Sequence, residues 1–394
     1  MASSYHDEGR SRMSNSAFGS AEVNAETPDH NKVLLKMDNL RLCSSGMFSN
    51  VYRGKIVGGN KDDPNSIALK KTWTKSDSSL TEMRILSRLN KFRHRNIMHL
   101  LYSFQTDHKD NRTCYGLVFE FMPSNLYTYI RELRKINNRR PDLTEVRLMA
   151  WQLFRGQAHL NVLKIIHRDI KPQNILVNPD LGTLKIGDFG SSKFYTAGEH
   201  SHSYHVTRYY RAPELIMGAT QYGPEIDVWS CGCVLGELLR CSVMWAGNSS
   251  EHQLYVIIST IGKPTFEEMK AMKVTDNTLI HAETAQKYVR AAPPRPADGF
   301  KKLVTANTAK EHLAINLLEQ ILRYAPNKRL SGPALLRHPF FSPIFEDDAI
   351  RSNGKSCSLA VTKKDYADAL RGDPLDEESR TGSKTKSSEQ TTDL

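Results

Sequence analysis

The sequence lacks any long apolar run. Of its 394 residues 39% are hydrophobic, but no stretch approaches the roughly 20 consecutive apolar residues of a membrane-spanning helix. The N-terminal stretch MASSYHDEGRSRMSNS contains no apolar signal-peptide core, and Ala2 stands where N-myristoylation requires glycine. We therefore expect a protein that is neither secreted nor attached to a membrane.

Cysteine is scarce as well. Only Cys231 and Cys233 lie close together, and no second cysteine pair follows at the spacing of a zinc site. We expect free and mostly buried thiols, which are typical of a reducing compartment, and hence a cytoplasmic or nuclear protein. The six cysteines are Cys43, Cys114, Cys231, Cys233, Cys241 and Cys357.

Two common nucleotide-binding fingerprints are also absent. Neither G-x-x-x-x-G-K-[ST] nor G-x-G-x-x-G occurs, which argues against a P-loop or Rossmann enzyme. No block dense in lysine and arginine and no known nucleic-acid module is present, so we expect no nucleic-acid partner. The net charge is +11: residues 37–345 carry +15, and the two ends carry −1 and −3. A positive central region suits anionic ligands such as phosphates or acidic peptides.

Both ends of the chain are polar. Residues 1–36 and 346–394 have scattered apolar residues only, so we expect disordered tails on either side of a folded region at 37–345. Within that region, β-branched and aromatic residues predict strands before about residue 122, with one helix near 79–90. The predicted strands are LRLCS (40–44), NVYRGKIV (50–57), SIALKKTW (66–73) and CYGLVFEFM (114–122).

From about residue 124 the pattern becomes helical. Residues 144–163 predict an amphipathic helix with Thr144 as its N-cap. Residues 226–241, IDVWSCGCVLGELLRC, are apolar almost all round and predict a buried helix. The apolar face of the first helix comprises Val146, Met149, Leu153, Phe154 and Leu160. A small β-rich part followed by a larger helical part predicts an α+β fold.

Chemically reactive side chains are concentrated in HRDIKPQNILV, residues 167–177. Asp169, Lys171 and Asn174 stand within one short loop, and KIGDFGSSK places Asp188 just after a further strand. Phosphoryl transfer from a magnesium nucleotide needs such groups. One carboxylate accepts a hydroxyl proton, a carboxylate and an amide hold Mg²⁺, and a cation neutralises the phosphate.

These segments resemble the signature motifs of protein kinases. HRDIKPQN and DFG are followed by RYYRAPE (208–214) and DVWS (227–230), in the order that the family shows. The resemblance implies a two-lobed kinase fold, with an antiparallel β-rich N-lobe at about 37–122 that contains one helix. The larger and mainly helical C-lobe would span about 123–345. It also implies ATP and Mg²⁺ as cofactors and proteins as substrates.

The same resemblance assigns roles to individual residues. Asp169 would be the catalytic base and Lys171 would contact the γ-phosphate, while Asn174 and Asp188 would hold the metal. The strand lysine that pairs with the nucleotide phosphates would be Lys70, because strand alternation points it away from Ile67 and Leu69. Its partner would be Glu82 on the N-lobe helix. Glu214 and Arg329 would form a buried structural ion pair.

The nucleotide pocket follows from the same resemblance. Val51 and Ala68 would cover one side of adenine and Leu176 the other, with Phe119 at the back of the pocket. Glu120 to Met122 would form the hinge that hydrogen-bonds the base. The stretch CSSGMFSNV, from Cys43 to Val51, would be the glycine-rich loop over the phosphates, with Gly46 as its middle glycine and Phe48 at its tip.

Serines replace the flanking glycines of that loop. Ser44 and Ser49 retain backbone N–H groups for phosphate but lack the conformational freedom and close approach of glycine. We therefore expect a stiffer loop and a raised KM for ATP, which restoring glycine at both positions should lower.

Residues 188–239, from DFGSSK to GELL, resemble one branch of kinases in particular, the glycogen synthase kinase 3 (shaggy) family of Ser/Thr kinases. The resemblance covers roughly residues 38–345 and implies autophosphorylation of Tyr204. That family recognises a priming phosphate on its substrate with three cations. Arg168 and Lys193 match two of them, but Thr81 stands at the third position, so we expect a weakened dependence on pre-phosphorylated substrates.

Two further departures limit what can be carried over. The serines of GRSRMSNSAF, Ser14 and Ser16, are spaced differently from the family's inhibitory serine. Residues 263–300 differ strongly around the family's scaffold-docking groove, so scaffold binding is left open. The alternative to an active kinase is a weak or inactive kinase fold that serves as a scaffold or binding module. Retention of all six catalytic groups favours activity: Lys70, Glu82, Asp169, Lys171, Asn174 and Asp188.

Overall fold

The computed structural model describes residues 19–46, 49–59, 63–74, 78–107, 113–135, 142–201, 207–274, 299–303 and 309–370. Their contacts divide the chain into two compact units. Unit 1 is drawn from Met1–Lys75 and Leu100–Phe121, and unit 2 from Ser76–His99 and Met122–Leu394. Each unit is described by itself.

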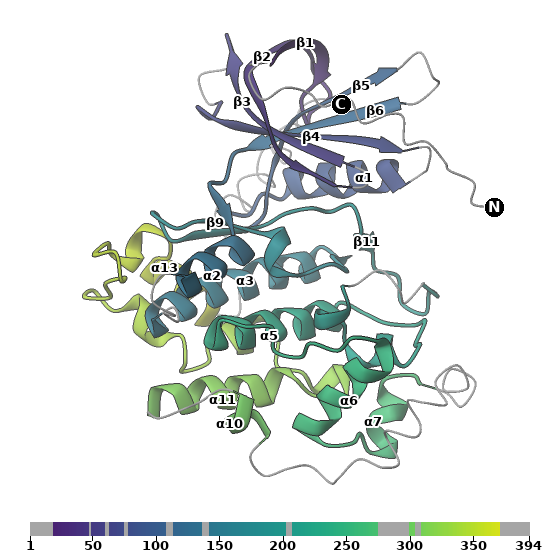
Figure 1. The fold of residues 1–394 in the computed structure, drawn as a ribbon, viewed down its shortest axis with the longest axis vertical. Coiled ribbons are helices and arrows are strands. Elements are labelled where there is room, and N and C mark those ends of the chain that lie inside the picture. The colour runs from purple at the N-terminus through teal and green to yellow at the C-terminus, as the bar shows by residue number, and fades with distance from the viewer. Residues whose placement is uncertain are drawn as a thin grey trace, which may run out of the picture. The chain divides into compact units, whose positions relative to one another are not determined.

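Unit 1 is an antiparallel barrel of six strands in the order β1-β2-β3-β4-β6-β5 (Figure 1). The barrel closes where Glu26 of β1 pairs with Ser103 of β5. All four predicted strands are confirmed, and β1 and β5 are additional. The strands are β1 (Gly19–Glu26), β2 (Lys32–Ser45), β3 (Ser49–Val57), β4 (Ile67–Thr74), β5 (Leu100–Asp107) and β6 (Thr113–Glu120).

The expectation of disorder is wrong for residues 19–36. They form β1 and the beginning of β2, which pair from Gly19 to Glu26. Ala25 and Leu35 are buried in the barrel core, so a few apolar residues at alternate positions are enough to fix these strands. Residues 1–18 lie outside the described part of the chain.

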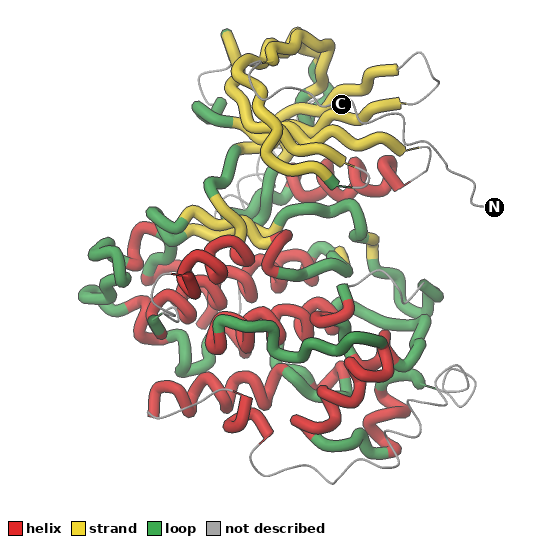
Figure 2. The backbone as a smooth tube through the Cα atoms, in the orientation of Figure 1, coloured by secondary structure: helices red, strands yellow, loops and turns green. Residues whose placement is uncertain are grey.

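Unit 2 is mainly helical, which confirms the α+β class (Figure 2). The predicted helix near 79–90 is confirmed as α1, but its contacts place it in unit 2. The helices of unit 2 are α1 (Ser78–Lys91), α2 (Leu126–Lys135), α3 (Leu143–Val162), α4 (Pro213–Ile216), α5 (Glu225–Arg240), α6 (Ser250–Ile261), α7 (Phe266–Ala271), α10 (Gly299–Leu303), α11 (Ala309–Ile321), α12 (Gly332–Leu336) and α13 (Lys363–Leu370).

Short strands and 3-10 turns complete unit 2 and carry its loops. β9 lies between β10 and β7 in a three-stranded antiparallel sheet, and β11 pairs with β8. The strands are β7 (Ser124–Asn125), β8 (Ile165–Ile166), β9 (Ile175–Asn178), β10 (Thr183–Ile186) and β11 (Lys193–Phe194). The 3-10 turns are η1 (Pro172–Asn174), η2 (Arg208–Tyr210), η4 (Pro326–Lys328), η5 (Ser342–Phe345) and η6 (Cys357–Leu359).

Helix α3 is the centre of unit 2. The predicted apolar face is buried, but so is every other residue from Glu145 to Leu160, so the helix is not amphipathic. Its polar side chains are buried with partners: Arg147 Nε, for example, donates to the Phe340 carbonyl over 2.8 Å. The N-cap is Asp142, not Thr144, because the Asp142 carboxylate accepts from the Glu145 N–H.

Helix α5 confirms the prediction of a buried helix. Its residues from Ile226 to Leu239 are all buried. Cys231 and Cys233 are free thiols on this helix, and burial raises the pKa of both above the ordinary cysteine value. Of the six cysteines, which are all free, only Cys43 is exposed. Within the described ranges there is no helix of the length and apolarity that crossing a membrane requires.

The expectation of a disordered tail from residue 346 is wrong for residues 346–370. They contain η6 and α13, and they pack against α3 through buried ion pairs. The order of this segment could not be predicted from its composition, because its buried residues include the charged Arg351 and Asp365. The partners of these two residues lie far away in the sequence. Residues 371–394 are outside the described part of the chain.

Two histidines with lowered pKa values, the buried His94 and the partly buried His99, should make the fold sensitive to acid. Burial lowers the pKa of His99 to about 3 and that of His94 well below its ordinary value. These histidines therefore bind protons in the unfolded chain at a higher pH than in the folded chain, and the free energy of unfolding falls as the pH drops below about 6.5. Each histidine contributes a loss of about 1.4 kcal/mol per pH unit between about 6.5 and its folded pKa.

We predict that His99→Gln loses about 1.4 kcal/mol less unfolding free energy between pH 7.5 and pH 5.5 than the unchanged protein. Glutamine retains an acceptor for the His94 N–H that His99 Nε2 now accepts over 3.1 Å. Urea unfolding at the two pH values measures the difference. Identical pH dependence in the two proteins would rule out His99 as a source of acid sensitivity.

Candidate active site

The loop between β8 and η1 brings together three residues that the sequence singled out. Lys171 Nζ lies 2.7 Å from Asp169 Oδ2, and Asn174 Nδ2 donates to the same oxygen over 3.0 Å. Thr207, which precedes η2, donates its hydroxyl to Asp169 Oδ1 over 2.9 Å and accepts from Lys171 over 3.1 Å. Both oxygens of the Asp169 carboxylate are thus oriented by neighbouring side chains.

The same loop contains a strained backbone that Asp227 holds in place. Arg168 adopts a left-handed conformation with φ +64°, which is uncommon for a side chain other than glycine. Asp227, buried on α5, accepts from the backbone N–H groups of His167 and Arg168 over 2.6 and 3.0 Å. Burial raises the pKa of this carboxyl above its ordinary value.

Asp188 stands two residues beyond β10, next to the loop that contains Asp169. Its backbone is also left-handed, with φ +59°, and its side chain is exposed. The preceding Gly187 donates to the Asn174 carbonyl over 2.9 Å and accepts from His167 Nε2 over 3.0 Å. Phe189 is buried edge-on against the His167 ring. The segments that carry Asn174 and Asp188 are therefore bonded directly to each other.

Two cations, Arg168 and Lys193, lie beside this loop. Arg168 Nε donates to the Ser191 carbonyl over 2.6 Å. Lys193 Nζ forms an ion pair of 3.0 Å with Glu199 and donates to Ser201 Oγ over 2.6 Å. The hydrogen bond and charge of Lys193 lower the pKa of the Glu199 carboxyl, which Arg168 also favours at longer range. A carboxylate of the chain itself therefore already faces these cations.

In unit 1 the predicted nucleotide residues lie on one face of the sheet. Val51 on β3 is paired directly with Lys70 on β4, and Ala68 is paired with Phe119 on β6. Ile67 and Leu69 alternate with Ala68 and Lys70 and are fully buried in the barrel core, as strand alternation predicts. Glu120 is the last residue of β6.

A protein kinase domain model matches residues 38–341. That range is well over half of the chain. The chain belongs to the protein kinase family. It is thus a phosphotransferase that binds ATP, and its β-rich N-terminal region and helical C-terminal region are those of the two-lobed kinase fold. Kinase domains in general use ATP with Mg²⁺.

The stretch that the sequence predicts as the glycine-rich loop includes the end of β2 and the beginning of β3. Ser44 pairs with Val51 and Ser49 with Thr72, so both serines have extended strand backbones. Serine adopts that conformation without strain, so the expected loss of backbone freedom does not arise at either position. What remains of the expected effect is the closer approach to phosphate that glycine permits. Phe48 lies outside the described residues, whereas Cys43 is an exposed residue of β2.

The predicted ion pair of the C-lobe is present. Arg329 binds Glu214 through two parallel hydrogen bonds, both of 2.7 Å, and the side chains are 0% and 2% exposed. Arg329 also donates to three backbone carbonyls and lies over the Trp229 ring. Every donor direction of the guanidinium is used, which is what a buried arginine requires.

The other predicted site residues lie on either unit or outside the description. Glu82 is buried on α1, Met122 begins unit 2, and Leu176 is half-buried on β9. Tyr204, Ser14, Ser16 and residues 275–298 lie outside the described residues.

Sequence reasoning missed three polar residues of the site. They are Thr207, Asp227 and Glu199, which contact Asp169, the loop backbone and Lys193 respectively. DVWS marks Asp227 as part of a family motif but does not reveal which backbone groups it binds. Those partners are 59 and 60 residues away, so only the folded chain identifies them.

Proposed function

We propose that this kinase transfers the γ-phosphate of ATP to serine and threonine side chains of proteins, as a divergent member of the glycogen synthase kinase 3 (shaggy) family. The observation that carries the proposal is the oriented Asp169 carboxylate, with Lys171 and Asn174 on one oxygen and Thr207 on the other. A carboxylate held in this way suits a base that receives the proton of a substrate hydroxyl. The Ser/Thr preference and the branch rest on the resemblance of residues 188–239.

The residues present fit a magnesium ion. Asn174 donates from Nδ2 to Asp169, so its amide oxygen is the atom that would bind the metal. The Asp188 carboxylate is exposed on the adjoining segment. Oxygen donors of these two types are the ligands that Mg²⁺ prefers. When bound, the ion would neutralise charge on the phosphates. Asn174 and Asp188 would hold it, and Lys171 would contact the transferred group.

Lys70 and Glu82 complete the proposed machinery. Lys70 would pair with the nucleotide phosphates, with Glu82 as its partner, and Val51, Ala68, Phe119, Glu120, Met122 and Leu176 would enclose the base. The shared sheet face of Val51, Ala68, Lys70 and Phe119 supports this arrangement. Proteins are the proposed substrates in a cytoplasmic or nuclear setting, and Tyr204 is a proposed site of autophosphorylation.

Transfer of labelled phosphate from ATP–Mg²⁺ to a generic Ser/Thr peptide tests the function. The unchanged protein should label the peptide, and Lys70→Met and Asp188→Ala should each abolish most of the signal. Asp347→Asn, an exposed carboxylate on residues 346–370, serves as a matched control that should keep the activity. A signal that survives both site substitutions would indicate a contaminant and favour a binding module.

Priming is expected to matter less than in the family. Thr81 supplies no charge at the third position, and Glu199 competes with an incoming phosphate for Lys193. One lost charge-assisted contact costs about 1.5–3 kcal/mol of phosphate binding. The kcat/KM ratio for matched primed and unprimed peptides should therefore be modest, and a preference of hundreds-fold or more would contradict the expectation.

Replacing Glu199 separates its contribution from that of Thr81. Glu199→Gln removes the competing charge and should raise the preference for the primed peptide. Glu267→Gln, an exposed residue in the first turn of α7, is the matched control and should leave the ratio unchanged. An unaltered ratio in Glu199→Gln would leave Thr81 as the sole cause.

A further inference from the structure

The segment 346–370, here called the C-terminal strap, lies beyond the kinase-domain match that ends at residue 341. It nevertheless packs on α3. Tyr366 of α13 stacks on Phe345, with ring centroids 4.7 Å apart, and Phe345 packs edge-on against Trp151 of α3. Cys357 and Arg351 of the strap are buried. The strap is therefore an integral part of unit 2.

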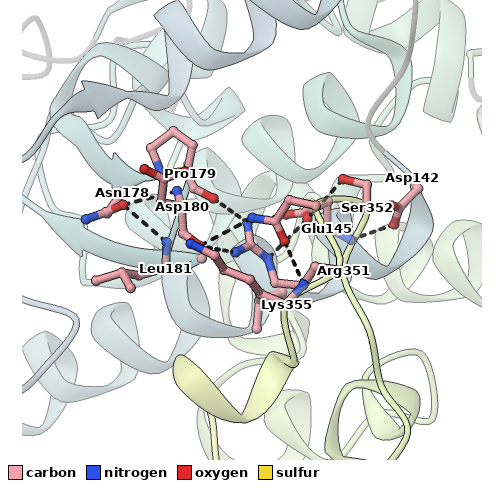
Figure 3. Close-up of polar contacts among 12 residues, drawn as sticks. Asp142, Glu145, Asn178, Pro179, Asp180, Leu181, Arg351, Ser352 and Lys355 are labelled. Carbon is pink, nitrogen blue, oxygen red and sulfur yellow. Dashed lines mark hydrogen bonds and ion pairs between the residues drawn. The ribbon is translucent and has the colours of Figure 1, made fainter.

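Arg351 joins the strap to the turn between β9 and β10 (Figure 3). Its guanidinium binds the Glu145 carboxylate of α3 over 3.1 and 3.2 Å. It also donates to the backbone carbonyls of Pro179 and Asp180 over 2.6 and 3.0 Å. Figure 3 shows the Arg351 side chain between Glu145 and the Pro179–Asp180 turn. One buried side chain thus fixes this turn to α3.

Asp365 attaches the other end of the strap to two arginines. Its carboxylate lies 2.7 Å from Arg155 of α3 and 3.2 Å from Arg95, in the segment after α1. Burial opposes ionisation, but Arg155 and Arg95 together hold the pKa of Asp365 below its ordinary value. Thr362 caps this group, since its backbone N–H and hydroxyl donate to Asp365 Oδ2 over 2.7 and 2.8 Å.

Both attachments converge on strand β10. Asn96, the neighbour of Arg95, donates from Nδ2 to the Leu184 carbonyl over 2.9 Å, and its own carbonyl accepts from the Ile186 N–H over 2.8 Å. Gln152 of α3 reaches the same strand, accepting from the Leu184 N–H and donating to the Gly182 carbonyl. Arg351 binds the turn between β9 and β10. Asp365 binds Arg95, and the next residue, Asn96, is hydrogen-bonded to β10.

This hairpin carries the proposed metal ligands. β9 begins immediately after Asn174, and β10 ends two residues before Asp188. Asp188 has a left-handed backbone, which persists only where the surrounding structure fixes it. A displacement of the hairpin would move both ligands together.

We propose that the C-terminal strap is a positioning element of the phosphotransfer site, in which Arg351 and Asp365 hold the β9–β10 hairpin so that Asn174 and Asp188 are set for Mg²⁺. This inference rests on the proposed function, because it concerns the metal ligands of that site. Arg351 and Asp365 are positioning residues, since neither contacts Asn174 or Asp188 directly through the bonds described above. Partners of this kind behind a metal site affect metal affinity by about 10–100-fold.

The test compares Arg351→Lys and Asp365→Asn with Asp347→Asn in the full chain. Asp347 lies on the same strap but forms an exposed pair with Lys363, so its loss should change nothing. We expect the apparent Mg²⁺ activation constant to rise about tenfold in both strap variants, while the KM for peptide stays constant. A general loss of stability would not divide the two constants in this way. Folded variants with the Mg²⁺ dependence of the unchanged protein would overturn the proposal.

Hydrogen exchange supplies a readout that needs no activity. The amides of Leu184 and Ile186 should exchange faster in the strap variants, while those of α5 keep their rates. Thr362→Ala removes the hydroxyl that donates to Asp365 Oδ2 and accepts from the Asp365 N–H, but it keeps the backbone N–H bond to the carboxylate. It replaces any variant that fails to fold. Unchanged exchange at β10 would refute the proposal even if phosphotransfer is undetectable. An unchanged protein without phosphotransfer would instead refute the proposed function alone.

Discussion

Asp169→Asn should lower kcat for peptide phosphorylation by about 10²–10⁴ and leave the fold intact. The amide cannot receive a proton from a hydroxyl at neutral pH. Its NH₂ group would also face the donors that now bind the carboxylate, Lys171 and Asn174 on Oδ2 and Thr207 on Oδ1. The loss should therefore fall mainly on kcat and less on the KM for ATP.

Steady-state kinetics with a Ser/Thr peptide and thermal unfolding of the same preparation separate the two effects. Asp180→Asn serves as a control of equal size, because Asp180 is exposed in the β9–β10 turn and contributes its backbone carbonyl to Arg351. It should retain full kcat. If Asp169→Asn keeps more than about a tenth of kcat, Asp169 is not the base.

Arg329→Met should destabilise the folded chain by about 3–5 kcal/mol. The substitution leaves the Glu214 carboxylate, which is 2% exposed, without its counter-charge, and it also removes the bonds to three backbone carbonyls. A buried charge without a partner costs much more than the ion pair itself contributes. Urea unfolding followed by a signal from the helical unit measures the change.

The double substitution Glu214→Met with Arg329→Met should recover part of that loss, because no charge is then left buried. Lys363→Ala is the contrasting control. It breaks the pair with Asp347, whose side chains are 64% and 87% exposed, and should cost less than about 1 kcal/mol. An Arg329→Met protein as stable as this control would show that Glu214 finds other compensation.

The clustering of Asp169, Lys171 and Asn174 was predictable from sequence because the three residues are close together in the chain. Asp169, Lys171 and Asn174 lie within six residues, and the turn that contains them brings their side chains to one carboxylate. The face of Lys70 was predictable for a similar reason, since strand alternation sets it opposite to the buried Ile67 and Leu69. Burial of α5 followed from an apolar sequence on all sides of the helix.

The errors arose where distant residues decide the outcome. Residues 19–36 are too polar on average to predict order, yet they close a barrel by pairing with β2 and β5. Helix α3 reads as amphipathic because its buried arginines resemble surface residues. Their partners come much later in the chain: Arg147 donates to the Phe340 carbonyl, and Arg155 donates to the Asp365 carboxylate.

The sequence by itself determined the kinase family and most of the strands and helices, because both depend on spacings within a few residues. Tertiary structure alone decided that residues 346–370 belong to the folded domain. Arg351 and Glu145 are 206 residues apart, and Asp365 and Arg155 are 210 apart. A charged residue in a polar segment predicts solvent exposure until its partner is known. Burial of such a charge is possible only once folding has brought the opposite charge to it.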